Sequence, residues 1–242
     1  MSKKRGLSPG RLKQIRCTAS GAGQRAYPFS IPAIAALDEI DVAPGVTFFA
    51  GENGTGKSTL VEALAVRADL NPEGGSRNLR FATRPSESSL HHHLELVWER
   101  RPSSAFFLRA ETFYNTATAY EGVDIRGYHE RSHGESFLDA FASPAPLVRP
   151  GAFVLMDEPE SALSVFGQLK LMRAVNDLVS AGSQFIVATH SPILLAFPDA
   201  WIYRLHDDGI DRVTYKETEA YQLTKSFVDA PERFLRHLLS DD

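Results

Sequence analysis

The amino-acid sequence predicts an α/β fold with a mainly parallel central sheet. Two continuous apolar runs, FVLMD at 153–157 and QFIVATH at 184–190, have the character of strands buried on both faces. The 164–181 stretch between them is long enough for a crossover helix. A third apolar run, GVTFFA at 45–50, is followed by helical spacing of apolar residues over 57–69. Strands that alternate with helices in this way are typical of an α/β domain.

The remaining elements are predicted from shorter patterns. Residues 11–18 alternate as a strand does, and 92–99 and 104–110 look like two strands on either side of an Arg-Pro-Ser turn. Residues 201–217 indicate a hairpin that turns at Asp-Gly. Residues 219–240 indicate two helical pieces that are separated near a proline.

Length and composition favour a single domain in a reducing compartment. The 242 residues suit one large domain, and Cys17 is the single cysteine, so no disulfide can form within one chain. No apolar run reaches about 18 residues, so we expect no membrane span and no membrane partner. The basic N-terminus lacks the apolar segment of a secretory signal, which favours a cytoplasmic location.

The basic residues are unevenly distributed along the chain. Seven of the 26 lysines and arginines precede the first acidic residue, Asp38, although the formal net charge is −4. They are Lys3, Lys4, Arg5, Arg11, Lys13, Arg16 and Arg25. This basic stretch is either an arm that binds nucleic acid or a solvated terminus that leads into the first strand.

The GENGTGKS segment at 51–58 fits the phosphate-binding pattern G-x-x-x-x-G-K-[ST] without a mismatch. It follows an apolar strand and precedes a helix, which is the context the pattern requires. Its glycines let backbone N–H groups approach phosphate oxygens, Lys57 would bridge the β and γ phosphates, and Ser58 would bind Mg²⁺. The predicted nucleotide-binding residues are Asn53, Gly54, Thr55, Gly56, Lys57, Ser58 and Thr59.

Two acidic residues directly follow the apolar run at 153–157. Asp157 would hold Mg²⁺ through a water, and Glu158 would lie near the water that attacks the phosphate. An isolated Asp-Glu pair is usually a solvated turn. Here the pair ends a buried strand about 100 residues after a phosphate loop, so we predict a hydrolase in which Glu158 orients or deprotonates the attacking water.

These motifs occur along the chain in the order that the ABC-type ATPase superfamily has. Residues 11–206 resemble this superfamily of P-loop, AAA-family ATPases, and in particular its soluble branch with the SMC and RecF proteins. RSHGE resembles the family signature LSGGE, which implies that Ser132 and Gly134 contact the γ-phosphate held by the opposite subunit. ATHS resembles the switch-histidine segment, which implies that His190 lies against the γ-phosphate. The resemblance implies a P-loop NTPase fold of ABC type and an ATP-dependent homodimer that encloses two ATP molecules with Mg²⁺.

Three further positions carry weaker parts of the resemblance. FFLRAE falls where the family has a strand ending in a glutamine, so Glu111 is implied to reach Mg²⁺ or water in place of that glutamine. Ser164, in ESALS, stands where many members have an aspartate that contacts the other subunit. Tyr27 lies near the position of the adenine-stacking aromatic residue, and it either stacks on adenine or packs against the protein.

The resemblance implies one ATPase domain, 1–242, with an antiparallel β subdomain and a short helical lobe. Its parts are 11–110 for the P-loop and β region, 111–143 for the helical signature lobe, 144–206 for the Walker B to switch-histidine core, and 207–242 for the C-terminal hairpin and helices. Residues 112–131 leave no room for the long coiled coil of SMC relatives, so the chain resembles compact bacterial ATPases without one.

A run of three histidines, His91 to His93, is a candidate metal site. On a strand, neighbouring side chains point to opposite faces, so only His91 and His93 would share a face. No cysteine or nearby acid completes a tetrahedral set of ligands, so we expect no metal site there.

Other functions compatible with a phosphate loop remain open. An ATP-gated module could close on nucleic acid or on an effector protein, with slow hydrolysis. A small-molecule kinase would leave RSHGE and ATHS unexplained, and the short lobe after Glu111 disfavours a transporter subunit. We therefore predict an Mg²⁺-dependent ATPase that drives a conformational change in a partner.

Overall fold

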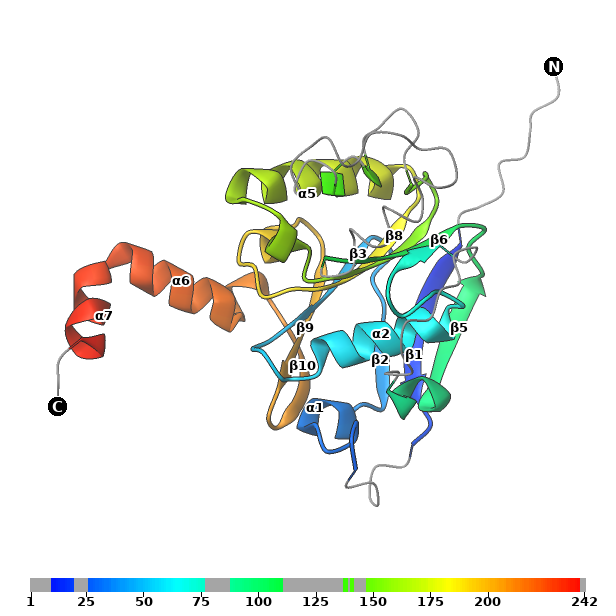
Figure 1. The fold of residues 1–242 in the computed structure, drawn as a ribbon, viewed down its shortest axis with the longest axis horizontal. Helices are drawn as coiled ribbons and strands as arrows, with labels where there is room; N and C mark the ends of the chain where they lie inside the picture. The colour runs from blue at the N-terminus through cyan, green and yellow to red at the C-terminus, as the bar shows by residue number, and fades with distance from the viewer. Residues whose placement is uncertain are drawn as a thin grey trace.

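The computed structural model describes residues 10–19, 26–76, 88–110, 137–138, 140–141 and 147–239. Its strands are β1 Arg11–Cys17, β2 Glu39–Asp41, β3 Val46–Ala50, β4 Gly75–Ser76, β5 Leu94–Arg100, β6 Ala105–Arg109, β7 Phe153–Asp157, β8 Gln184–Ala188, β9 Trp201–His206 and β10 Gly209–Val213. They form a larger sheet in the order β10-β9-β3-β8-β7-β6-β4 and a smaller sheet in the order β2-β1-β5 (Figure 1).

Helices lie on both faces of the larger sheet. The α-helices are α1 Pro32–Ala35, α2 Lys57–Arg67, α5 Val165–Ser180, α6 Glu219–Asp229 and α7 Pro231–Leu238. Short 3₁₀ helices are η1 Ser89–His93, η3 Pro159–Ala162, η4 Leu194–Ala196 and η5 Tyr215–Glu217. Figure 1 shows α2 on one face of the sheet and α5 on the other, whereas α6 and α7 extend away from the body.

Parallel pairing runs through the centre of the larger sheet. It joins β9 to β3, β3 to β8, β8 to β7 and β7 to β6. Antiparallel pairing adds β10 and β4 at the two edges, and it joins β1 to β2 and β5 in the smaller sheet. The predicted fold class is thereby confirmed. Because parallel strands end at the same edge, the segments after β3, β7 and β8 lie together.

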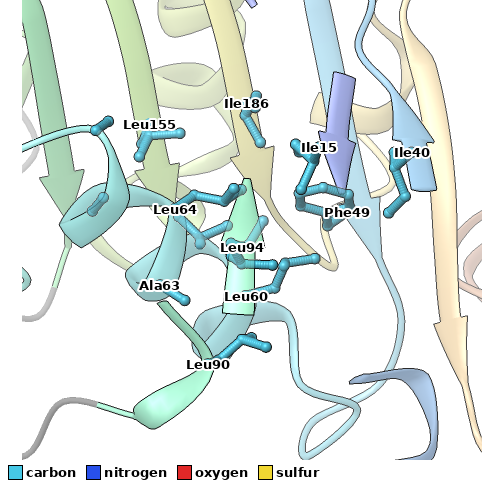
Figure 2. Close-up of a cluster of buried hydrophobic side chains, with 14 of the residues drawn as sticks. Ile15, Ile40, Phe49, Leu60, Ala63, Leu64, Leu90, Leu94, Leu155 and Ile186 are labelled. Atoms are coloured by element: carbon cyan, nitrogen blue, oxygen red, sulfur yellow. The ribbon is translucent and has the colours of Figure 1, made fainter. Parts of the chain in front are cut away.

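The apolar runs of the sequence are strands covered on both faces. Along β3, Phe49 packs in one hydrophobic cluster with Leu64 of α2, as Figure 2 shows, whereas Phe48 belongs to the cluster that holds the buried side of α5. Leu155 and Met156 of β7 divide between the two clusters in the same way. Full burial of each such side chain stabilises the fold by about 1.5–3 kcal/mol.

A buried glutamine ties the smaller sheet to the larger one. Gln184, at the start of β8, is 1% exposed. Its Nε2 donates to the carbonyl oxygens of Leu12 (2.8 Å) and Ala43 (2.7 Å), and its Oε1 accepts from the backbone N–H of Leu12 at 2.8 Å. Because both amide hydrogens are satisfied inside the protein, this contact fixes where β1 lies against the central sheet.

The strands at 92–99 and 104–110 are present as β5 and β6, but they belong to different sheets. β5 pairs with β1, whereas β6 pairs with β7. The placement of the histidine run on a strand is wrong, because His91 to His93 end the 3₁₀ helix η1. His93 packs edge-on against Phe29, with ring centroids 5.2 Å apart.

The C-terminal predictions are confirmed element by element. β9 and β10 form the predicted antiparallel hairpin, α5 is the predicted crossover helix, and one residue, Ala230, separates α6 from α7, which begins at Pro231. No helix in the described ranges is long and apolar enough to cross a membrane. The lobe at 111–143 lies almost wholly outside the described residues, so the division of the chain into four parts stays a prediction.

Candidate functional site

The glycine loop connects β3 to α2 at the carboxyl edge of the larger sheet. Gly51 and Gly56 have φ angles of 146° and 97°, a region that favours glycine. A Cβ on Gly51 would lie 2.4 Å from the carbonyl oxygen of Leu205, so no larger residue fits there. α2 begins at Lys57, and the free N–H groups of its first turn face the loop. This backbone has the geometry of a phosphate cradle.

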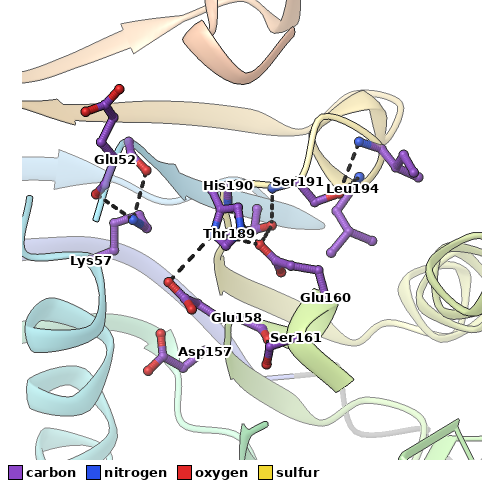
Figure 3. Close-up of polar contacts among 12 residues, drawn as sticks. Glu52, Lys57, Asp157, Glu158, Glu160, Ser161, Thr189, His190, Ser191 and Leu194 are labelled. Carbon is purple, nitrogen blue, oxygen red and sulfur yellow. Dashed lines mark hydrogen bonds and ion pairs between the residues drawn. The ribbon is translucent and has the colours of Figure 1, made fainter. Parts of the chain in front are cut away.

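Lys57 folds back over the loop. The residue is 3% exposed, and its Nζ donates to the carbonyl oxygens of Gly51 and Glu52, at 2.8 Å each (Figure 3). Burial lowers the pKa of the Lys57 ammonium below its ordinary value, and the negative charges of Glu158 and Asp157 partly oppose this shift. A desolvated cation of this kind interacts strongly with an incoming phosphate.

Ser58 and Asp157 form a pair suited to a magnesium ion. The Ser58 hydroxyl on α2 donates to Oδ1 of Asp157, at the end of β7, across 3.0 Å. Asp157 is 5% exposed. Magnesium prefers oxygen ligands, and in nucleotide sites it is usually bound by one or two carboxylates together with waters and phosphates. These two residues therefore fit the ion that the sequence predicts.

Arg109 approaches the opposite side of the same carboxylate. It ends β6 and lies level with Asp157 in the parallel register. Its Nε is 3.6 Å from Oδ2 of Asp157, and its Nη1 donates to Oε2 of Glu62 on α2 at 3.2 Å. All three side chains are at least three-quarters buried, so these charges interact more strongly than surface pairs do. The sequence analysis did not single out Arg109.

The structure brings Glu158 and His190 together. Glu158 follows β7 in the left-handed conformation, with φ 46° and ψ 53°. Its backbone N–H donates to the carbonyl oxygen of Ala188 at 3.0 Å, which joins this turn to the end of β8. Oε1 of Glu158 lies 3.8 Å from Nδ1 of His190. A non-glycine residue in this conformation is strained by about 1 kcal/mol or more, and such strain gathers at functional sites.

A third carboxylate, which the sequence analysis assigned only to the ESALS segment, also reaches this turn. Oε1 of Glu160 accepts hydrogen bonds from the hydroxyl of Thr189 and from the backbone N–H of His190 (Figure 3). No local pattern indicated this contact, because it links residues 29 and 30 positions apart.

Tyr27 lies at the rim of the glycine loop. Its hydroxyl is 3.3 Å from Oγ1 of Thr59, and the residue is 61% exposed. Tyr27 is therefore not packed into the core, and its stacking on adenine stays a prediction. On another side of the loop, Asn53 and His190 border a pocket of about 440 Å³ whose opposite wall is the first part of α6.

Four predicted positions remain, and the structure describes one of them, Ser164. Ser132, Gly134 and Glu111 lie outside the described residues, so their roles stay predictions. Ser164 is the N-cap of α5, because its hydroxyl accepts the backbone N–H of Gly167 at 3.1 Å.

Two family models match parts of the chain. The one described as "AAA domain, putative AbiEii toxin, Type IV TA system" matches residues 136–196, and a second described as "AAA domain" matches residues 32–87. The first match holds the Asp157–Glu158 turn and His190, and the second holds the glycine loop. The two matches therefore cover the segments that the fold brings together.

Curated relatives match about two thirds of the chain. The arabinose import ATP-binding protein of Ralstonia nicotianae is 28% identical over 188 residues, which is 66% of this chain and 36% of that protein. The hemin import ATP-binding protein of a Chelativorans species is 29% identical over 174 residues, which is 61% of this chain and 66% of that protein. The chain is thus similar to ATP-binding proteins of import systems, which agrees with the phosphate-loop geometry of its site. It spans less than two thirds of the length of these relatives.

Two solved structures are also similar to the chain. The SMC head domain from Thermotoga maritima is 16% identical, with 84% of this chain and 98% of that chain covered and a TM-score of 0.45. An ABC transporter component from Clostridium perfringens is 17% identical, with 84% and 92% covered and a TM-score of 0.44.

Proposed function

We propose that the protein binds ATP with Mg²⁺ and hydrolyses the β–γ phosphoanhydride bond in a head-to-tail dimer that encloses two ATP molecules. The hydrogen bond between Ser58 and Asp157 carries this proposal, because it joins the phosphate loop to the carboxylate that a metal–nucleotide complex needs. The ATP-binding relatives support the choice of nucleotide.

Each residue would have a separate task in hydrolysis. The loop N–H groups and Lys57 would hold the β and γ phosphates. Glu158 would accept a proton from the attacking water while the bond from the γ phosphorus to the bridging oxygen breaks, which leaves ADP and phosphate. His190 would contact the γ-phosphate. Ser58 and Asp157 would hold Mg²⁺, which would neutralise part of the negative charge of the phosphates.

The second subunit would complete each site. By the resemblance to the ABC signature, Ser132 and Gly134 of one chain would contact the γ-phosphate bound to the other. Hydrolysis would then remove the phosphate bridge and open the dimer, so the conformational change would be passed to a partner.

The alternative of an ATP-gated clamp on nucleic acid is less well supported. Two residues of the basic stretch, Lys13 and Arg16 on β1, pair with acidic residues on the neighbouring strands. Lys13 Nζ lies 3.6 Å from Glu99 Oε1, and Arg16 Nε lies 3.0 Å from Glu39 Oε2. Because these charges are partly neutralised within the sheet, they offer less attraction to a phosphate backbone.

The test measures the ATPase rate per chain against protein concentration, for the wild type, for Ser132→Arg and for Lys57→Ala as an inactive reference. Shared sites predict a wild-type rate that rises with concentration and a large loss in Ser132→Arg. A concentration-independent rate that survives Ser132→Arg would refute the dimer and leave a monomeric ATPase. Negligible turnover together with an ATP-dependent gain in salt-sensitive DNA binding would favour the clamp.

A further inference from the structure

Glu160 makes a concentrated set of contacts at the end of β8. Its side chain is only 7% exposed. Oε1 accepts from Oγ1 of Thr189 at 2.7 Å and from the backbone N–H of His190 at 2.8 Å, and it lies 3.4 Å from Nδ1 of the His190 ring. One carboxylate oxygen thus contacts both the main chain and the side chain of the predicted switch histidine.

These contacts join two turns that carry different predicted tasks. Glu158 and Glu160 lie on the turn that follows β7, and Ser161 closes that turn by donating its N–H (3.0 Å) and its hydroxyl (2.8 Å) to the carbonyl oxygen of Glu158. The β8 side is joined twice, by the Glu158–Ala188 backbone hydrogen bond and by the Glu160 carboxylate. The two turns are therefore linked through both the main chain and a side chain.

A purely structural link would not need a charge at this position. Burial of a carboxylate is unfavourable unless its oxygens are hydrogen-bonded, and Oε2 of Glu160 is buried without a hydrogen bond to any described residue. A neutral acceptor could receive the same hydrogen bonds from Thr189 and His190 at a lower desolvation cost. The charge lies 3.4 Å from Nδ1 of His190, closer than Oε1 of Glu158 at 3.8 Å, and it also acts on the Lys57 ammonium.

We propose that Glu160 is a positioning residue, which holds His190 by its backbone and by Nδ1 so that Nε2 is presented to the γ-phosphate. The inference rests on the proposed ATP hydrolysis. A carboxylate only accepts hydrogen bonds, so for Oε1, 3.4 Å away, to hold Nδ1 that nitrogen must carry a proton. The partner of one imidazole nitrogen fixes the proton position and the orientation of the ring, as it does in other sites that use histidine.

Two substitutions separate the hydrogen bonds from the charge. Glu160→Gln keeps an oxygen that can accept hydrogen bonds from Thr189 and from the His190 backbone. It removes the negative charge that the carboxylate places beside Nδ1 of His190. Glu160→Ala removes every contact. Glu232→Gln, on the exposed side of α7, is the matched control. Thermal unfolding of each variant establishes that it is folded before its kinetics are compared.

The expected result is a separation of kcat from binding. ATP affinity and KM stay within about twofold, while kcat falls about tenfold in Glu160→Gln and about a hundredfold in Glu160→Ala, the scale of a 1 Å misplacement near the reacting atoms. Independently of turnover, ¹⁵N NMR of the histidine rings, assigned with His190→Gln, should show a proton on Nδ1 of His190 in the wild type. Glu160→Ala should lose that preference.

The two readouts keep this inference distinct from the proposed function. An unchanged His190 ¹⁵N signal in Glu160→Ala would overturn the positioning role, whatever the ATPase rate. An equal fall of kcat and of ATP affinity would overturn it too, because it would indicate general damage to the site. A wild-type chain without ATPase activity would refute the proposed function, while the NMR comparison would still decide whether Glu160 holds His190.

Discussion

Ser58 donates its hydroxyl to Oδ1 of Asp157 at 3.0 Å, while Arg109 lies 3.6 Å from the other oxygen of that carboxylate, Oδ2. The two oxygens therefore have different surroundings. Oδ1 faces Ser58 in the first turn of α2, and Oδ2 faces a guanidinium that is itself paired with Glu62. This division leaves Oδ1 on the nucleotide side, where a metal ion would be held, and makes Oδ2 the anchored side.

Removing the charge of Asp157 should separate metal use from nucleotide binding. Asp157→Asn keeps the size of the side chain and an acceptor for Ser58, but it weakens the attraction for Mg²⁺. We expect kcat to fall at least about a hundredfold with saturating Mg²⁺, on the scale of metal-ion charge stabilisation. ATP binding in excess chelator should stay within about threefold.

The control for this variant is Asp177→Asn. Asp177 is exposed on α5 and pairs with Arg173 one helical turn away, so its loss should leave activity unchanged. If Asp157→Asn retained its Mg²⁺-dependent rate, Asp157 would not be the metal-binding carboxylate.

Glu158→Gln should trap an ATP-bound dimer. The amide keeps the shape of the side chain but cannot take the proton of the attacking water, so ATP should remain bound between the subunits. Light scattering should give twice the monomer mass with ATP and the monomer mass with ADP. A variant that stays monomeric with ATP would contradict the sandwich arrangement.

The backbone of Glu158 gives a separate prediction about stability. Its φ of 46° is unfavourable for a residue with a Cβ and acceptable for glycine. Glu158→Gly should therefore raise the free energy of unfolding by about 0.5–1 kcal/mol while abolishing hydrolysis. Glu158→Gln keeps the Cβ and should leave stability nearly unchanged. Chemical denaturation of both variants makes the comparison, and a glycine variant less stable than the glutamine variant would exclude strain at this turn.

Local signals in the sequence predicted much of the fold. The runs that became β3, β7 and β8 are apolar at every position because both faces are covered, and that pattern needs no knowledge of distant residues. β5 and β6 were predicted as strands, but their assignment to different sheets depends on β1 and β7, which lie far away in the chain.

The sequence predicted the site residues that belong to a motif. It did not predict those whose role depends on a contact with a residue far away in the chain. Lys57, Ser58 and Asp157 belong to patterns whose spacing is set by the phosphate and metal they would bind. Arg109 and Glu160 act through partners on other strands or helices, Glu62 and His190, and no spacing rule relates these positions. Their contacts exist only once the order β8-β7-β6 is known.

The charge of Lys57, which is needed to bind ATP, should lower the free energy of unfolding of the nucleotide-free protein. Its lowered pKa means that the charged form is less favourable in the folded chain than in the unfolded chain. Lys57→Met should therefore abolish ATP binding and leave the nucleotide-free protein at least as stable, with a gain of about 1 kcal/mol near pH 7.

The pH dependence gives the sign of this effect. Between the lowered folded pKa of Lys57 and about 10.5, the unfolded lysine binds more protons than the folded one, so wild-type stability rises with pH relative to the variant. The stability difference between Lys57→Met and the wild type should shrink as the pH rises through that window. A difference that widens instead would mean that the ammonium is stabilising, and the direction of the pKa shift would be wrong.

Arg109 should set the affinity of the site for magnesium. Its guanidinium lies between the carboxylates of Glu62 and Asp157, which are 15% and 6% exposed. Arg109→Gln removes positive charge beside Asp157, so the Mg²⁺ concentration that gives half-maximal ATPase activity should fall several-fold. Because two partly buried carboxylates would then be less compensated, the free energy of unfolding should fall by about 2–3 kcal/mol.

Glu62→Gln provides the opposite perturbation of the same network. Without the Glu62 charge, the guanidinium of Arg109 would be attracted more completely to Asp157, and half-maximal activity should need more Mg²⁺. Arg173→Gln, which breaks an exposed pair on α5, should change neither quantity. Opposite shifts in Arg109→Gln and Glu62→Gln would show that Arg109 competes with the metal for Asp157. A rise of the half-maximal Mg²⁺ concentration in both variants would show instead that the network only supports the shape of the site.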